Sequence, residues 1–192
     1  MLGCEALGCK TIEAVFEQTF RHSHRVQLQG GAPEPLYLPA QDPHAFHQLI
    51  YTLDYPASAL HEIAHWCLAS DAQLLLKDWG HWYVPDGRTA EQQARFQGAE
   101  ARVQALEWIL SKAAGRPFRE SADNLGGEGL DPSPFRQAIH QQVARYCEQG
   151  LPPRALALAQ ALAAARQQRF SLSLDDYPLA ALTAMTAAES IS

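Results

Sequence analysis

Two histidines and a glutamate form the pattern H-E-x-x-H at His61, Glu62 and His65. On an α-helix, residues four positions apart lie on one face about one turn apart, so the two imidazoles could bind one divalent metal ion. Glu62 would lie about 100° around the helix axis from His61, where it could act as a proton acceptor or as a hydrogen-bond partner beside the metal. The alternative is a buried helix with two hydrogen-bonded histidines.

The residues around this motif favour a buried helix. Asp54 could cap it, and Pro56 suits its first turn. The apolar residues that would bury it are Ala57, Ala59, Leu60, Ile63, Ala64 and Leu68. Burying two histidines and a glutamate there without a partner would be costly, and a metal ion would provide that partner.

A catalytic metal site needs a third protein ligand, which usually comes from another element of the fold. The longest helical pattern, from Thr89 to about Lys112, is the best donor. Its apolar face is centred near Val103, and both Glu100 and Glu107 lie on one flank of that face. Helix geometry therefore leaves both glutamates open as the third ligand, and both could instead face water.

The remaining patterns predict an α+β fold, in which a mostly helical single domain carries a small antiparallel sheet. Further helices are expected at residues 10–23, 134–148 and 151–168. Val26–Gln29 and Leu36–Pro39 are expected to be strands that pair antiparallel, and His47–Thr52 to be a third short strand. The metal site would lie between the H-E-x-x-H helix and the long helix that follows it.

The composition fits one domain over residues 1–192, because 47% of the residues are hydrophobic and only 19% are charged. The core is expected over about residues 10–168, and the tail, residues 169–192, is expected to be loosely ordered. The net charge of −6 argues against nucleic-acid binding, which needs a basic surface, and leaves room for a cationic ligand.

Other features of the chain bear on its compartment. No stretch of about 18 apolar residues occurs, and no basic segment followed by an apolar one opens the chain, so we expect no membrane span and no signal peptide. The four cysteines contain no C-x-x-C pair, which favours scattered reduced thiols over a structural zinc site. We therefore expect a cytoplasmic protein without a membrane partner.

An aromatic block follows the H-E-x-x-H motif. Trp79, Trp82 and Tyr83 lie close together, and Asp86-Gly87 is typical of a tight turn, so a short aromatic strand that enters this turn is expected. The aromatic side chains could belong to the core or form the wall of a substrate pocket, with Asp78 and Asp86 as the nearest acids.

Several stretches extend the motif into a longer pattern. They are Pro35–Ala40, Tyr55–Cys67, Asp78–Arg88, Phe96, Glu100, Gln104–Trp108 and Asp123–Leu125. With this combination the chain resembles the bacterial elongation factor P hydroxylases, over most of residues 35–150. The first 20 residues and the tail after about residue 168 match weakly.

The resemblance implies a non-haem iron enzyme that hydroxylates the lysine of elongation factor P that already carries a β-lysyl group. It implies Fe(II) held by His61, His65 and Glu100, and so selects one of the two glutamates that geometry leaves open. Two histidines and one carboxylate are the facial arrangement of Fe(II) oxygenases, which fits molecular oxygen as co-substrate. The sequence does not indicate the reductant. Gln97 stands where relatives are expected to have an acid.

The substrate side chain in this interpretation is cationic. Asp78, Asp86 and Asp123 are expected to bind its amino groups, with Glu62 as a supporting base. An alternative is a zinc-dependent peptidase, in which Glu62 would take a proton from a metal-bound water. A third hypothesis is a metal-stabilised module that binds the translation factor without catalysis.

Overall fold

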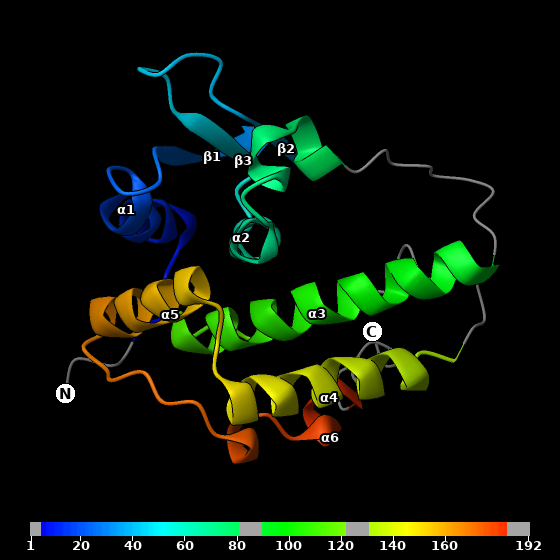
Figure 1. Ribbon diagram of the computed structural model, residues 1–192. Coiled ribbons are helices and arrows are strands. Elements are labelled where there is room, and N and C mark those ends of the chain that lie inside the picture. Colours follow the sequence, from blue (N-terminus) through cyan, green and yellow to red (C-terminus); the bar gives the residue numbers. More distant parts are fainter. Residues whose placement is uncertain (1–4, 81–89, 122–130, 184–192) are drawn as a thin grey trace.

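The computed structural model describes residues 5–80, 90–121 and 131–183 (Figure 1). Its α-helices are α1 (Cys9–Phe20), α2 (Pro56–Leu68), α3 (Ala90–Ala113), α4 (Ser133–Gln149), α5 (Pro153–Ala165) and α6 (Leu179–Thr183). Its strands are β1 (Val26–Ala32), β2 (Leu36–Leu38) and β3 (His47–Thr52), and its 3-10 turns are η1 (Gln73–Leu75), η2 (Lys77–Gly80) and η3 (Leu174–Asp176). The predicted α+β class, with mostly helices and one small sheet, is confirmed.

The sheet is mixed, with the strand order β1-β3-β2. β3 pairs parallel with β1 and antiparallel with β2, so the predicted antiparallel pairing of the first two strands is wrong. β3 takes the central position instead, where both of its edges are paired, because it carries the fully buried Leu49 and Tyr51. Gly30 allows this packing, because a Cβ atom there would lie only 2.4 Å from the ring of Tyr51.

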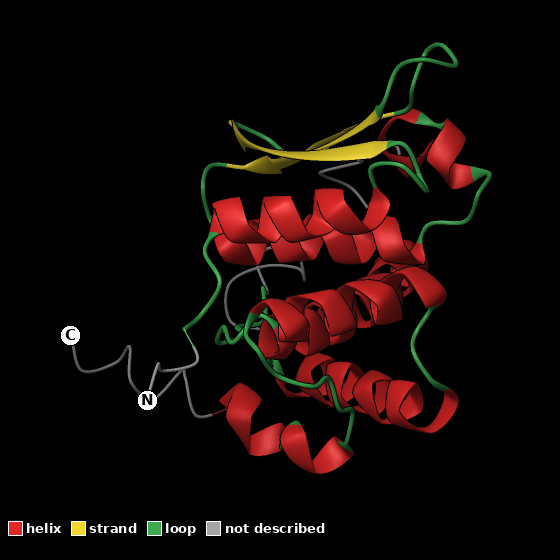
Figure 2. Ribbon diagram, turned by 90° about the vertical axis from the view of Figure 1, so that its left-hand side faces the viewer, coloured by secondary structure: helices red, strands yellow, loops and turns green. Residues whose placement is uncertain are grey.

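The elements are stacked in layers. Figure 2 shows the sheet on one side of the α-helices, with α1 and α2 beneath it and the other α-helices further from it. α2 contacts β3 on one side and α3 on the other, and α3 in turn contacts α4 and α5. The H-E-x-x-H helix therefore lies between the sheet and the long helix, and it contacts the helix from which a third metal ligand was expected.

Aromatic and cationic contacts hold α2 in place. The ring of Trp66 packs against Phe16 and Phe20 of α1, with centroid distances of 5.2 and 4.8 Å. Arg154 of α5 lies over the same indole ring at 4.9 Å and donates hydrogen bonds to the carbonyls of Cys67 and Ala69 at the end of α2. A cation at a helix C-terminus stabilises the unpaired carbonyls there, so α5 fixes one end of the metal-motif helix.

The helix boundaries agree closely with those predicted, but not in every detail. α2 begins at Pro56 with Tyr55 as its N-cap residue and no side-chain cap, so the predicted cap by Asp54 is wrong. Thr89, the expected first residue of the long helix, lies outside the described residues.

The stretch after α5 is mostly exposed but contributes two buried side chains, those of Tyr177 and Leu182. Tyr177 is fully buried and its ring meets that of Trp108 edge to face at 5.3 Å. The expectation of a loosely ordered tail stays a prediction, and residues 184–192 lie outside the description. Among the described residues, no helix combines the length and the hydropathy that a membrane crossing would need.

Candidate metal centre

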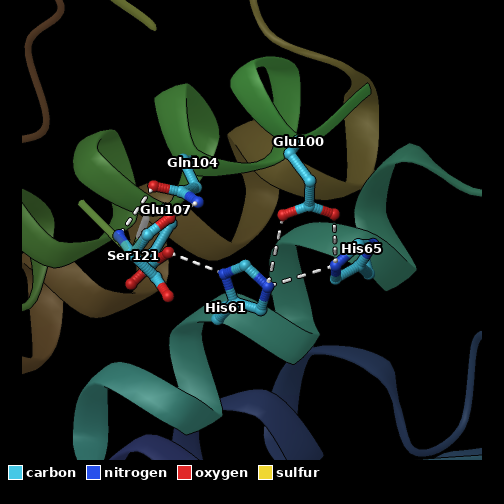
Figure 3. A network of polar contacts seen from close by, with 6 residues as sticks. All are labelled: His61, His65, Glu100, Gln104, Glu107 and Ser121. Carbon is cyan, nitrogen blue, oxygen red and sulfur yellow. Dashed lines mark hydrogen bonds and ion pairs between the residues drawn. The ribbon is translucent and has the colours of Figure 1, made fainter. Parts of the chain in front are cut away.

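Three side chains from α2 and α3 converge where the two helices meet (Figure 3). The Nε2 atoms of His61 and His65 are 3.2 Å apart. The Glu100 carboxylate lies beside both, 3.5 Å from His65 Nε2 and 3.9 Å from His61 Nε2. One donor atom from each residue lies within 4.8 Å of the others, so the cluster could hold a metal ion.

Local structure explains this convergence. The spacing of four residues places His61 and His65 on one face of α2, while Leu60, Ile63 and Ala64 are completely buried on the rest of the helix. The cluster is not sealed: the side chains of His61 and His65 are 24% and 23% exposed, and that of Glu100 is 15% exposed. A ligand could therefore reach the three donor atoms from solvent.

Glu107 occupies a different position from Glu100. Its Oε2 atom lies 2.8 Å from Nδ1 of His61, on the side of the ring away from the cluster (Figure 3). The structure thus separates the two glutamates that helix geometry left equivalent. The contact between Glu107 and His61 was not predicted, although two acids seven residues apart on one helix flank, facing two histidines four apart, are the pattern that could have indicated it.

The pKa values of His61, Glu107 and Glu62 depend on one another. Burial would lower the pKa of His61, but the hydrogen bond and charge of Glu107 outweigh it and raise this pKa to about 9. Burial raises the pKa of Glu107 despite the opposing effect of His61. Burial also raises the pKa of Glu62 to about 7, with His61 opposing the shift and Glu100 adding to it. Among the described residues, the site contains the three carboxyl groups of Glu62, Glu100 and Glu107 beside two histidines, which favours a bound cation.

The donor set fits a divalent metal ion. Because Nδ1 of His61 is engaged by Glu107, Nε2 is the atom that this ring offers to the cluster. Two imidazole nitrogens and one carboxylate leave further coordination positions open, as catalytic Fe(II) and Zn(II) sites both require. The side chains therefore fit either metal.

Glu62 is not one of the three converging residues. Within the described part of the chain, its carboxylate makes no hydrogen bond or ion pair. A carboxyl group with a pKa of about 7 beside a metal site could accept or donate a proton near neutral pH, so its predicted catalytic role stays a prediction.

Asp78 has a structural contact. Its Oδ1 atom accepts a hydrogen bond from the backbone N–H of Tyr37 at 2.9 Å, and the next residue, Trp79, stacks on the Tyr37 ring at 4.0 Å. Asp78 and Trp79 both have left-handed backbone angles, with φ of 47° and 59°, which is costly for residues other than glycine and is maintained here by these contacts.

The other sequence predictions for this region have different outcomes. The aromatic strand is wrong at Trp79, because its left-handed backbone, with φ of 59°, is incompatible with an extended strand. Trp82, Tyr83 and Asp86 lie outside the described residues, and so does Asp123. A substrate-binding role for Asp78, Asp86 and Asp123 therefore stays a prediction.

The fold and the cluster together define a mostly helical protein with a site that could hold one metal ion between two helices. A family model described as elongation factor P hydroxylase matches residues 15–177 of the chain. A protein of Haemophilus influenzae named elongation factor P lysine hydroxylase is 46% identical over 153 residues, which cover 80% of this chain and 86% of that protein. The chain belongs to the elongation factor P hydroxylase family.

Proposed function

We propose that this chain hydroxylates the β-lysylated lysine side chain of elongation factor P, with Fe(II) as its metal and molecular oxygen as co-substrate. The name of the Haemophilus influenzae relative supports the reaction and the protein substrate. The observation that carries the proposal is the cluster of His61, His65 and Glu100, because a hydroxylase without another cofactor needs a metal site with open positions.

The three residues would hold the iron through the two Nε2 atoms and the carboxylate. Iron bound there would supply the activation of dioxygen that no side chain can provide. In a monooxygenase reaction one oxygen atom enters a C–H bond and the other leaves as water, so each turnover consumes two electrons from a reductant. A translation factor as substrate would place this reaction in the cytoplasm.

The chain's own residues would bind and orient the substrate. The cluster is partly exposed, so a long lysine side chain could reach it from solvent. Its ammonium groups would be attracted by the carboxylates of Glu62, Glu100 and Glu107, and Glu62 has no other partner among the described residues. Glu62 would then orient an amino group or hold a proton beside the reacting carbon.

A second candidate is a zinc peptidase, and the position of Glu62 favours it. A carboxyl group with a pKa of about 7 next to a two-histidine site could take the proton of an attacking water. The geometry of the three donors is equally suited to this chemistry. The family match supports the hydroxylase instead.

The test is mass spectrometry of β-lysylated elongation factor P after incubation with the iron-loaded protein, oxygen and a reductant. We expect a gain of one oxygen atom with the wild type and none with His61→Ala. His22→Ala, at an exposed histidine, is the matched control and should keep full activity. Metal analysis of anaerobically purified protein should give iron.

Three other results would contradict the proposal. Cleavage of the factor by a zinc-containing protein would indicate the peptidase. Full hydroxylation by His61→Ala would show that His61 does not bind the metal. Binding of the factor without any product under reducing, aerobic conditions would indicate a binding module.

A further inference from the structure

Glu107 lies outside the three-residue cluster but contacts one of its members. The Nδ1–H group of His61 donates a hydrogen bond of 2.8 Å to Oε2 of Glu107. We infer that Glu107 is a positioning residue that orients the His61 ring, so that Nε2 of this ring faces the metal. This inference rests on the proposed metal centre and concerns how the protein builds it.

The burial of Glu107 argues for a specific role. The residue is only 5% exposed, and its neighbours in sequence, Leu106 and Trp108, belong to the core. A carboxylate in such a place costs free energy unless it is paired. Among the described residues, His61 is its one hydrogen-bonding or ion-pairing partner. Packing alone would favour an apolar side chain at this position.

The geometry shows what the contact controls. An imidazole ring can offer either of its nitrogens to a metal, depending on its rotation and on which nitrogen carries the proton. The contact with Glu107 fixes both, because it holds the proton on Nδ1. It leaves Nε2 directed at the cluster, 3.2 Å from Nε2 of His65 and 3.9 Å from the Glu100 carboxylate.

One helix carries both the third donor and this support. Glu100 and Glu107 are seven residues apart, about two turns, and lie on the same side of α3. They contact the His61 ring from its two nitrogen sides (Figure 3). α3 therefore sets the position of the carboxylate and the orientation of the histidine together.

The first measurement is the affinity for Zn(II), by competition with a chromophoric chelator. Glu107→Leu removes the acceptor at nearly constant volume and should weaken zinc binding by roughly 10–100-fold. Glu107→Gln keeps an oxygen that can accept the Nδ1 proton and should lose less. Gln104→Leu is the matched control: Gln104 is also buried on α3, but it bonds the backbone of Ser121 rather than His61, so its zinc affinity should be unchanged.

The second measurement separates positioning from a merely structural role. In the zinc-loaded wild type, nitrogen-15 NMR should show His61 bound through Nε2, with a downfield Nδ1 proton that exchanges slowly with water. Glu107→Leu should lose this signal, Glu107→Gln should shift it upfield, and Gln104→Leu should leave it in place. If Glu107→Leu does not fold, the shift in Glu107→Gln decides.

Two results would overturn the inference. One is a zinc affinity in Glu107→Leu equal to that of the wild type. The other is an unchanged Nδ1 signal in Glu107→Gln. Neither measurement depends on turnover, so a wild type that binds zinc as described but does not hydroxylate the factor would contradict the proposed function and leave the role of Glu107 standing.

Discussion

The two halves of α3 differ in their surroundings. From Ala101 to Ala113, every side chain except those of Arg102 and Lys112 is buried, and this half packs against α2, α4 and α5. The described side chains before Ala101 are exposed or partly exposed, and Glu100 stands at the boundary. The buried half therefore anchors the helix, while Glu100 reaches the cluster from the last position before burial begins.

Two buried polar side chains of this half contact other parts of the chain. Gln104 holds the backbone of Ser121 through two hydrogen bonds of 2.9 and 3.0 Å, and Glu107 holds the ring of His61. Core residues and the residues of the proposed metal site are thus neighbours on one helix. Substitutions of the one kind and of the other should separate stability from metal binding.

The largest effect is expected from Glu100→Ala. Loss of this proposed metal ligand should lower hydroxylation by more than the roughly 10–100-fold typical of a residue that only supports a ligand. The Tm of the metal-free protein should be unchanged or slightly raised, because the substitution removes a carboxylate that repels those of Glu107 and Glu62. The measurements are the mass-spectrometric assay and calorimetry. Glu91→Ala, at an exposed residue of the same helix, is the control. An unfolded Glu100→Ala protein would show that the two properties do not separate.

The opposite result is expected from Leu106→Ala in the buried half. Leu106 is 0% exposed, and a cavity of this kind costs about 2–5 kcal/mol of the free energy of unfolding. Urea unfolding of the metal-free protein measures this loss, with the exposed Arg102→Ala as control. At temperatures where Leu106→Ala is folded, its zinc affinity should match the wild type. A large loss of affinity would mean that the core and the site are coupled.

The sequence predicted more of the site than of the sheet. The spacing of His61 and His65 is a property of one helix, so it could be interpreted locally. The choice between Glu100 and Glu107 depends on where α2 meets α3, which is tertiary packing, and only the resemblance to a family selected Glu100. The order of the strands also depends on tertiary packing, because burial of β3 decides it.

The turn at Asp78 could not be predicted from the local sequence for another reason. Two successive left-handed residues other than glycine are disfavoured by steric clashes within the backbone and with Cβ. They occur because the β2 backbone and the Tyr37 ring contact them. The role of Glu107 was hidden similarly, since the residue that it holds is 46 positions away.

The smallest effect expected is a dependence of metal binding on pH, which arises from the contact between His61 and Glu107. In the metal-free protein the pKa of His61 is raised from 6.5 to about 9, so between these values a metal ion must displace a proton from the ring. The apparent zinc affinity should therefore rise with pH by up to about tenfold per unit, and level off above pH 9.

The raised pKa of His61 has the opposite effect on the stability of the metal-free protein, which falls as the pH rises. A raised pKa contributes stability that is fully present below pH 6.5 and is lost as the pH rises through 9. The raised pKa of Glu62 acts in the same direction between pH 4.5 and about 7. The difference in Tm between zinc-loaded and metal-free protein should thus widen from pH 6.5 to pH 9. Glu107→Gln should flatten this trend, because its amide no longer stabilises the imidazolium of His61, whereas Leu106→Ala should lower both curves and keep the trend. A difference in Tm that stays constant with pH in the wild type would show that no raised pKa couples metal binding to the fold.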